Sequence, residues 1–170
     1  MKSTGVVRRI DELGRIVIPK EIRKNLGIRE GESLEIYVDD CKLIMQKHSK
    51  LDSYQDTINN IIKFVSNSFN ISINLYDREK LLYYTNDILG KISFIKEFND
   101  IIVNRKEEII DVKINEEVYK IYCKPIIISS DVIGIIIFEL KDNLEEIIKI
   151  ANFLSQIITK KIDIWHILDK

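Results

Sequence analysis

The chain has 170 residues, of which 45% are hydrophobic and 31% charged, a composition typical of a soluble globular protein and not of a disordered one. Its 26 basic and 27 acidic residues give a formal charge of -1, so the chain as a whole is not a basic protein. The N-terminus lacks a secretory signal pattern and no apolar run could span a bilayer, which predicts a cytoplasmic protein with no membrane partner.

The charge is unevenly distributed along the chain. Residues 1–50 contain 11 basic and 8 acidic side chains, a balance of +3, whereas residues 51–170 contain 15 and 19, a balance of -4. Such an offset suggests a basic binding module joined to a more acidic body. We therefore expect two domains, residues 1–50 and residues 51–170, and a polyanion as the partner of the first.

The first predicted element is a short β-hairpin. Residues 4–10 and 15–18 are rich in β-branched side chains, and residues 11–14, Asp-Glu-Leu-Gly, have the chemistry of a turn between them. The alternation of a strand places Ile16 and Ile18 on one face and Arg15 on the other. One face can join a core while Arg15 reaches outward.

A helix is predicted over residues 19–26. Pro19 favours the first turn of a helix, and Gly27 is suited to ending one. At about 100° per residue, the cations of this helix fall within one quadrant, opposite its apolar side chains. The cations are Lys20, Arg23 and Lys24, and the apolar residues are Ile22 and Leu26.

Two further strands complete the first domain. Apolar and polar residues alternate over 34–38 and again over 43–46, and Asp39-Asp40 separates the two runs. A β-β-α-β-β unit of about fifty residues buries little core, and it has no disulfide or metal to compensate. We infer that it dimerises by interleaving strands.

These residues carry a resemblance to a known family. The run Arg-Arg-Ile-Asp-Glu-Leu-Gly-Arg-Ile-Val-Ile-Pro-Lys-Glu-Ile-Arg, residues 8–23, and the later Leu-Glu-Ile-Tyr-Val, residues 34–38, resemble the AbrB-type transition-state regulator domain. The resemblance implies a swapped-hairpin β-barrel dimer that binds double-stranded DNA, in a cytoplasmic, nucleoid-associated protein.

Position by position, the resemblance assigns the DNA contacts to basic residues. Lys24 departs from the arginine pair that is common at the helix end, and lysine offers a point charge where arginine offers a planar fork. Lys20 is an additional candidate. The predicted DNA-binding residues are Arg8, Arg9, Arg15, Lys20, Arg23 and Lys24.

AbrB-type domains also occur in antitoxins of the MazE kind, whose C-terminal tails are short and wrap a toxin. Here the remaining 120 residues are patterned as a folded domain, so an antitoxin-like protein whose C-terminal part binds a protein partner is the alternative interpretation. The whole chain is similar to AbrB-family sporulation regulators that carry a C-terminal GAF domain. That similarity implies a transcriptional regulator of sporulation genes.

The second domain has its own periodicity. Apolar residues at helical spacing run from Tyr54 to Phe69, and strands are expected at 71–75, 81–85, 108–114, 118–124 and 134–140, with a helix at 94–103. This is an α+β pattern, a GAF-like antiparallel sheet flanked by helices. The final helix, about 143–165, has two apolar stripes. The first is Ile147, Ala151, Leu154, Ile158, Ile162 and Trp165, and the second is Ile150, Phe153 and Ile157.

Two apolar stripes exceed what one sheet can cover. We therefore expect the first and last helices of this domain to pack against another chain as a helical bundle, which would join two dimers into a homotetramer.

A GAF-like domain also raises the question of a small-molecule ligand. The candidates to line a pocket are Tyr83, Tyr84, Asn86, Asp87, Phe94 and Tyr122, and the sequence does not identify the ligand. No catalytic, cofactor or metal site is predicted, because neither the two cysteines nor the two histidines stand in a constellation with partners. A reductase acting on methionine sulfoxide would need a reactive cysteine with a resolving partner, and Cys123 is the only cysteine after residue 50.

Overall fold

The structure, a computed structural model, describes residues 5–28, 30, 34–47 and 49–168, with side chains as far as residue 164. The chain divides into two compact units, Met1–His48 and Ser49–Lys170, each of which is described by itself. Residue 4 of the predicted hairpin and the side chain of Trp165 lie outside the described residues. Helices and antiparallel sheets are both present, so the α+β prediction is confirmed.

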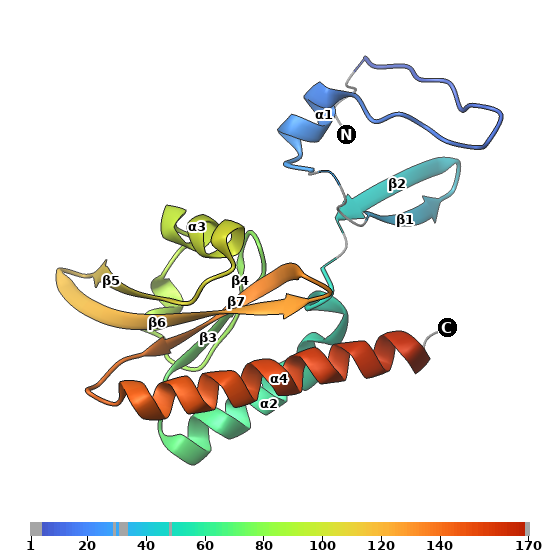
Figure 1. The fold of residues 1–170 in the computed structure, drawn as a ribbon. Helices are drawn as coiled ribbons and strands as arrows, with labels where there is room; N and C mark the ends of the chain where they lie inside the picture. Colours follow the sequence, from blue (N-terminus) through green and yellow to red (C-terminus); the bar gives the residue numbers. More distant parts are fainter. Residues whose placement is uncertain (1–4, 29, 31–33, 48, 169–170) are drawn as a thin grey trace. The chain divides into compact units, whose positions relative to one another are not determined.

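The N-terminal unit contains one short helix and one hairpin (Figure 1). Helix α1 spans Lys20–Asn25, within the predicted range, and strands β1 (Leu34–Asp39) and β2 (Lys42–Lys47) pair antiparallel. Residues 5–10 and 15–18 run as extended chain without strand pairing, although the sequence predicts a hairpin there. Because β1 and β2 pair only with each other, a single chain offers these segments no neighbouring strand.

The hairpin β1–β2 leaves an apolar face uncovered. Ile36 is directly opposite Met45, and Val38 is opposite Leu43, so the four side chains share one face. They are between 38% and 77% exposed. None of the described residues of this unit is buried. An isolated two-stranded hairpin is marginally stable at best, so this face requires another surface to cover it.

The C-terminal unit is a five-stranded antiparallel sheet flanked by helices. The strand order is β4-β3-β7-β6-β5. The elements in chain order are η1 (Asp52–Tyr54), α2 (Gln55–Phe69), β3 (Ile73–Tyr76), β4 (Leu81–Tyr84), η2 (Leu89–Lys91), α3 (Lys96–Asn104), β5 (Glu108–Ile114), β6 (Glu117–Ile128), β7 (Asp131–Glu139) and α4 (Leu144–Leu168). The helix-strand order and the two-sided arrangement agree with the prediction.

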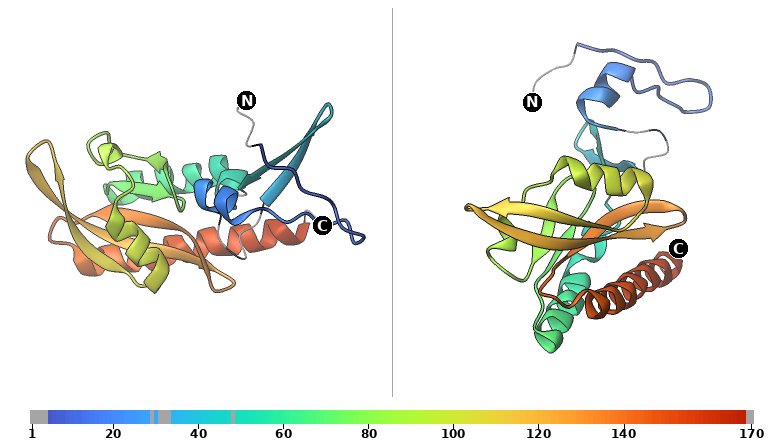
Figure 2. Two further views of the ribbon diagram at one scale, coloured as in Figure 1. Left: turned by 90° about the horizontal axis from the view of Figure 1, so that it is seen from above. Right: turned by 60° about the vertical axis from the view of Figure 1, so that its left-hand side comes forward.

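Two hydrophobic clusters lie on opposite faces of this sheet. On one face, α2 and α4 lie side by side (Figure 2), and the first predicted stripe of α4, from Ile147 to Ile162, is buried there. On the other face, α3 covers an aromatic group in which the Phe98 ring lies 5.1 Å from Tyr76 and 5.6 Å from Phe94. The second stripe of α4 is divided, since Ile150 is buried whereas Phe153 is 59% exposed.

None of the described helices is long and apolar enough to cross a membrane.

The tightest backbone approach in the C-terminal unit is at Gly134 on β7. A Cβ atom there would lie 2.3 Å from the carbonyl oxygen of Tyr76 and 2.5 Å from a methyl group of Leu51. We predict that Gly134→Ala lowers the free energy of unfolding by about 2 kcal/mol, because a strand backbone cannot move aside without breaking pairing. Denaturant unfolding of the full chain measures this.

Gly90→Ala is the matched control. A Cβ at Gly90 would meet the ring of Tyr84 at 2.8 Å, but that ring is 46% exposed and can rotate away. Its cost should be clearly smaller than that of Gly134→Ala, and equal costs at the two sites would contradict the assigned packing.

Candidate nucleic-acid interface

All six predicted DNA-binding cations are exposed in the N-terminal unit. Arg8 and Arg9 lie on the extended segment 5–10, and Arg15 follows the turn at residues 11–14. The remaining three, Lys20, Arg23 and Lys24, lie on α1. Each of the six side chains is therefore accessible to solvent, and the local structure around it determines its position.

Asp11 organises the turn that carries Arg15. Its carboxylate oxygen Oδ1 accepts hydrogen bonds from the backbone N–H groups of Leu13 (3.0 Å) and Arg15 (2.8 Å). The other oxygen, Oδ2, accepts a hydrogen bond from Nε of Arg15 at 2.8 Å. The main chain closes the same turn, since Asp11 N–H donates to the Arg15 carbonyl and Gly14, at φ +74°, donates to the Asp11 carbonyl.

This arrangement leaves the outer edge of the Arg15 guanidinium open. Asp11 engages Nε only, so the two terminal nitrogens remain to bind a phosphate or a base edge. The hydrogen bond from the Arg15 backbone, followed by that from its side chain, lowers the pKa of the Asp11 carboxyl. The carboxylate therefore stays ionised throughout neutral pH, and its hold on the turn is lost only as the pH falls through that lowered pKa.

Local signals at both ends shape helix α1. Pro19 precedes the helix with an extended ψ, and its carbonyl accepts a hydrogen bond from Arg23 N–H. At the other end Gly27 takes φ +62°, Ile28 N–H donates to the Arg23 carbonyl and Gly27 N–H to the Lys24 carbonyl. This is a Schellman motif, which requires the left-handed conformation that glycine adopts readily.

The helix end also suits the charges it carries. Arg23 and Lys24 lie in the last turn, where cations oppose the partial negative charge of the helix C-terminus. Within the described residues no ion pair neutralises the other five cations, which are Arg8, Arg9, Lys20, Arg23 and Lys24. No ion pair among the described residues therefore compensates the charge that these five side chains offer to a polyanion.

Asp11 joins the candidate interface although the sequence pattern marks only the turn at residues 11–14 and not this carboxylate. By charge alone, an acidic residue in a basic segment only lowers the attraction to a polyanion. The signal was the spacing: Asp11 and Arg15 are four residues apart across a glycine turn, which brings carboxylate and guanidinium together.

The six candidate ligand-pocket residues of the C-terminal unit lie on both sides of the sheet. Tyr83 and Tyr122 pack with the cluster under α2 and α4, whereas Phe94 belongs to the cluster under α3. Asn86 Oδ1 accepts hydrogen bonds from the N–H groups of Ile88 and Leu89, a turn-forming role. Tyr84 and Asp87 are exposed. The structure does not bring the six around one cavity.

The cysteines show no sign of catalytic activation. Cys41 is exposed and Cys123 is buried, and burial raises the pKa of the Cys123 thiol, which disfavours the reactive thiolate. In the part of the chain that is described, histidine, cysteine and carboxylate side chains form no group of three or more that could hold a metal ion.

Comparison with known proteins relates both units to bacterial regulators. The profile of the family described as antidote-toxin recognition MazE, bacterial antitoxin, matches residues 7–51. Stage V sporulation protein T of Bacillus subtilis is 35% identical over 156 residues, which cover 84% of this chain and 86% of that protein.

The N-terminal unit has a second relative. The transition state regulatory protein AbrB of Bacillus subtilis is 65% identical over 48 residues, which cover 28% of this chain and 50% of AbrB. The N-terminal DNA recognition domain of AbrB, known from a solution structure, is 64% identical in sequence and matches with a TM-score of 0.26. The match covers 28% of this chain and 91% of the AbrB domain.

A GAF domain/HD domain protein from Geobacter sulfurreducens matches a longer part of the chain, with 11% identity and a TM-score of 0.44. The match covers 67% of this chain and 98% of that one.

We predict that Asp11→Ala weakens duplex DNA binding by about three- to fivefold at fixed salt, the effect of losing a surface ion pair that orients one contact. The direction is informative, since removing a negative charge would by itself strengthen binding to a polyanion. Fluorescence anisotropy with a labelled duplex measures the affinity.

Glu12→Ala is the matched control, because Glu12 is the adjacent exposed carboxylate and makes none of the turn's hydrogen bonds. It should leave the affinity unchanged or raise it slightly. Stronger binding by both variants would show that Asp11 acts only through its charge.

Proposed function

The chain belongs to the family of stage V sporulation protein T, and we propose on that basis that it is a DNA-binding transcriptional regulator of sporulation genes. The observation that carries the proposal is the set of six exposed cations on a segment 65% identical to AbrB, with Arg15 held by Asp11. AbrB is by name a transition state regulatory protein, and we propose no enzymatic activity for this chain. It acts in the cytoplasm, at the nucleoid.

The DNA-binding surface is built by two copies of the N-terminal unit. One copy leaves the hairpin β1–β2 uncovered on its apolar face and the segments 5–10 and 15–18 without strand partners. Pairing with a second copy would cover that face and satisfy those backbone groups in one step. A dimer would then present each of the six cations twice along one duplex.

Phosphate contacts account for the affinity in this proposal. Six exposed cations per copy, on a unit whose described helix α1 has only six residues, suit backbone contacts and readout of DNA shape. Arg15 and Arg23 are best suited to bidentate contacts, whereas Lys20 and Lys24 supply point charges. Sequence preference would then depend mainly on how the duplex deforms against the paired surface.

The C-terminal unit joins dimers into a tetramer. Phe64 on α2 is 73% exposed and Phe153 on α4 is 59% exposed, on the two helices that pack together on one face of the sheet. Contiguous exposed apolar patches mark association surfaces, and we infer that these two rings contribute to one such patch. A second copy of α2 and α4 would complete a four-helix bundle over these rings.

The antitoxin-like alternative has less support. The MazE match is confined to residues 7–51, which is the segment that the DNA-binding proposal already uses. The C-terminal unit is a folded sheet-and-helix unit, and the similarity to stage V sporulation protein T extends across it.

We predict that Arg15→Ala and Arg23→Ala each weaken DNA binding by about tenfold at moderate salt and leave thermal unfolding unchanged, since both side chains are exposed. For the parent protein, log affinity against log salt should fall by about 0.9 per phosphate neutralised, and each variant should show a shallower slope.

Lys42→Ala serves as the control for this pair, because Lys42 is a cation of the same unit that pairs with Asp39 and lies outside the assigned surface. It should bind like the parent. If the DNA affinity of the parent does not change with salt, or if both arginine variants bind DNA like the parent, the assigned surface is wrong.

We predict that Phe153→Lys converts a tetramer into a dimer, because a charge in the bundle interface cannot be desolvated cheaply. Analytical ultracentrifugation of the full chain measures the change. Asn104→Lys is the control, since Asn104 is an exposed polar residue on α3, which covers the opposite face of the sheet, and this change should leave the tetramer intact.

The mass of the Phe153→Lys species separates the two interfaces. A dimer supports both, a monomer would contradict independent pairing of the N-terminal units, and an unchanged tetramer would place the second interface elsewhere.

A further inference from the structure

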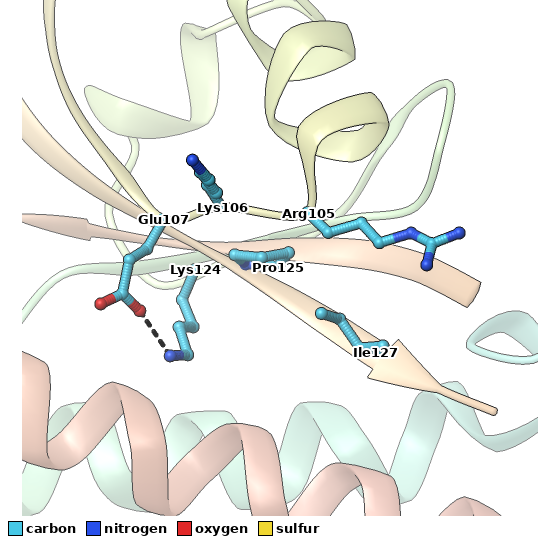
Figure 3. Close-up of a pocket in the computed structure, with 6 residues that line it drawn as sticks. All are labelled: Arg105, Lys106, Glu107, Lys124, Pro125 and Ile127. Carbon is cyan, nitrogen blue, oxygen red and sulfur yellow. Dashed lines mark hydrogen bonds and ion pairs between the residues drawn. The ribbon is translucent and has the colours of Figure 1, made fainter. Parts of the chain in front are cut away.

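A groove in the C-terminal unit is lined by three cations and two apolar residues (Figure 3). Its volume is about 380 Å³, and its lining residues are Arg105, Lys106, Glu107, Lys124, Pro125 and Ile127. Small-molecule sites in proteins commonly have volumes of about 300–1,000 Å³. None of these residues belongs to the candidate DNA-binding surface, so the groove is an independent feature.

The groove exists because β5 stops pairing before β6 ends. The β5–β6 register ends with Glu108 opposite Cys123, so Lys124–Ile128 has β7 on one side and no strand on the other. Arg105 follows α3 in the left-handed conformation, at φ +57°, and turns the chain back toward the sheet. Residues 105–107 thus run beside the open edge of β6 without pairing with it.

The open edge is poorly suited to an added peptide strand. Pro125 has no N–H to donate, and Lys124 precedes it with a charge; both are devices that discourage strand addition at a sheet edge. An occupant of this groove is therefore recognised by side chains and not by a backbone ladder, which favours a small molecule over an extended peptide.

The charge of the groove favours an anion. Glu107 is its only acidic lining residue, and its Oε2 accepts a hydrogen bond from Lys124 Nζ at 2.5 Å, a contact that lowers the pKa of Glu107. Arg105 and Lys106 make no ion pair with any described residue. In Figure 3 their side chains extend on either side of Pro125, so each can turn toward a guest above it.

The groove also offers apolar contact. The Pro125 ring and the side chain of Ile127, which is 37% exposed, form an apolar surface between the cations.

We propose that this groove binds a small molecule that carries a phosphate or carboxylate group beside an apolar portion. The acid group binds Arg105 and Lys106, and the apolar portion packs on Pro125 and Ile127. Lys124, whose side chain lies on the other face of β6, turns from Glu107 across the open edge of the strand to reach the same acid group. Glu107 occupies Lys124 while the groove is empty and competes with the incoming anion. The proposal does not depend on DNA binding.

Isothermal titration calorimetry of the full chain tests the site with three probes: phenyl phosphate, benzoate and phenol. At least one of the two anions should bind saturably with one site per chain, and neutral phenol should bind far more weakly. The stronger of the two anions identifies the acid group. Absence of saturable binding by both anions, or equal binding of phenol, would overturn the proposal.

Two variants with opposite expected effects locate the binding. Lys124→Gln should raise the dissociation constant by about tenfold, through loss of a charge-assisted hydrogen bond. Glu107→Gln should lower it several-fold, because Lys124 is then released for the anion. Lys113→Gln, at an exposed lysine of β5 outside the groove, is the control and should bind like the parent.

If Glu107→Gln and Lys124→Gln both bind like the parent, the anion binds elsewhere and the assignment fails. If Lys124→Gln folds poorly, the Glu107→Gln variant still tests the proposal. Glu107 is substantially exposed, so this substitution should not disturb folding.

Discussion

The apolar face of the β1–β2 hairpin is the constraint from which the proposed assembly follows. A unit with no buried residue among those described has no core of its own to hold it together, and in the proposed dimer the second copy would supply that core. Folding and pairing of this unit would then be a single equilibrium, and its stability would rise with protein concentration. The DNA surface of the proposed dimer would share part of this dependence, since Arg8 and Arg9 lie on the segment 5–10, which has no strand partner among the described residues of one copy.

Helix α1 and the turn at Asp11 have a defined local geometry even though the N-terminal unit lacks a core. Both are fixed by bonds that are local in sequence: the Schellman motif at Gly27 and the hydrogen bonds that Asp11 makes with residues two and four positions later. Local bonds can form in each copy before pairing. In the proposed dimer, the second copy would then only fix the positions of helix α1 and of the turn at residues 11–14, which are already formed.

The same distinction explains what could be predicted from the sequence. Pro19 and Gly27 act on their own helix, and the apolar period of α4 acts along one element, so these features were predictable. The strands expected at residues 4–10 and 15–18 depend on a pairing partner that a single chain does not supply. The groove beside β6 could not be foreseen, because it depends on where β5 ceases to pair, a tertiary feature with no local pattern.

Pro125 has a consequence for the size of the assembly. A protein that pairs through one surface at its N-terminal unit and another at its C-terminal helices closes into a finite particle only if no third surface is adhesive. The unpaired edge of β6 is such a third surface, and edge-to-edge sheet contacts would link particles into open-ended chains. In the proposed assembly, Pro125 and Lys124 at that edge would therefore limit the number of copies that associate, so that the particle bound to DNA has a defined stoichiometry.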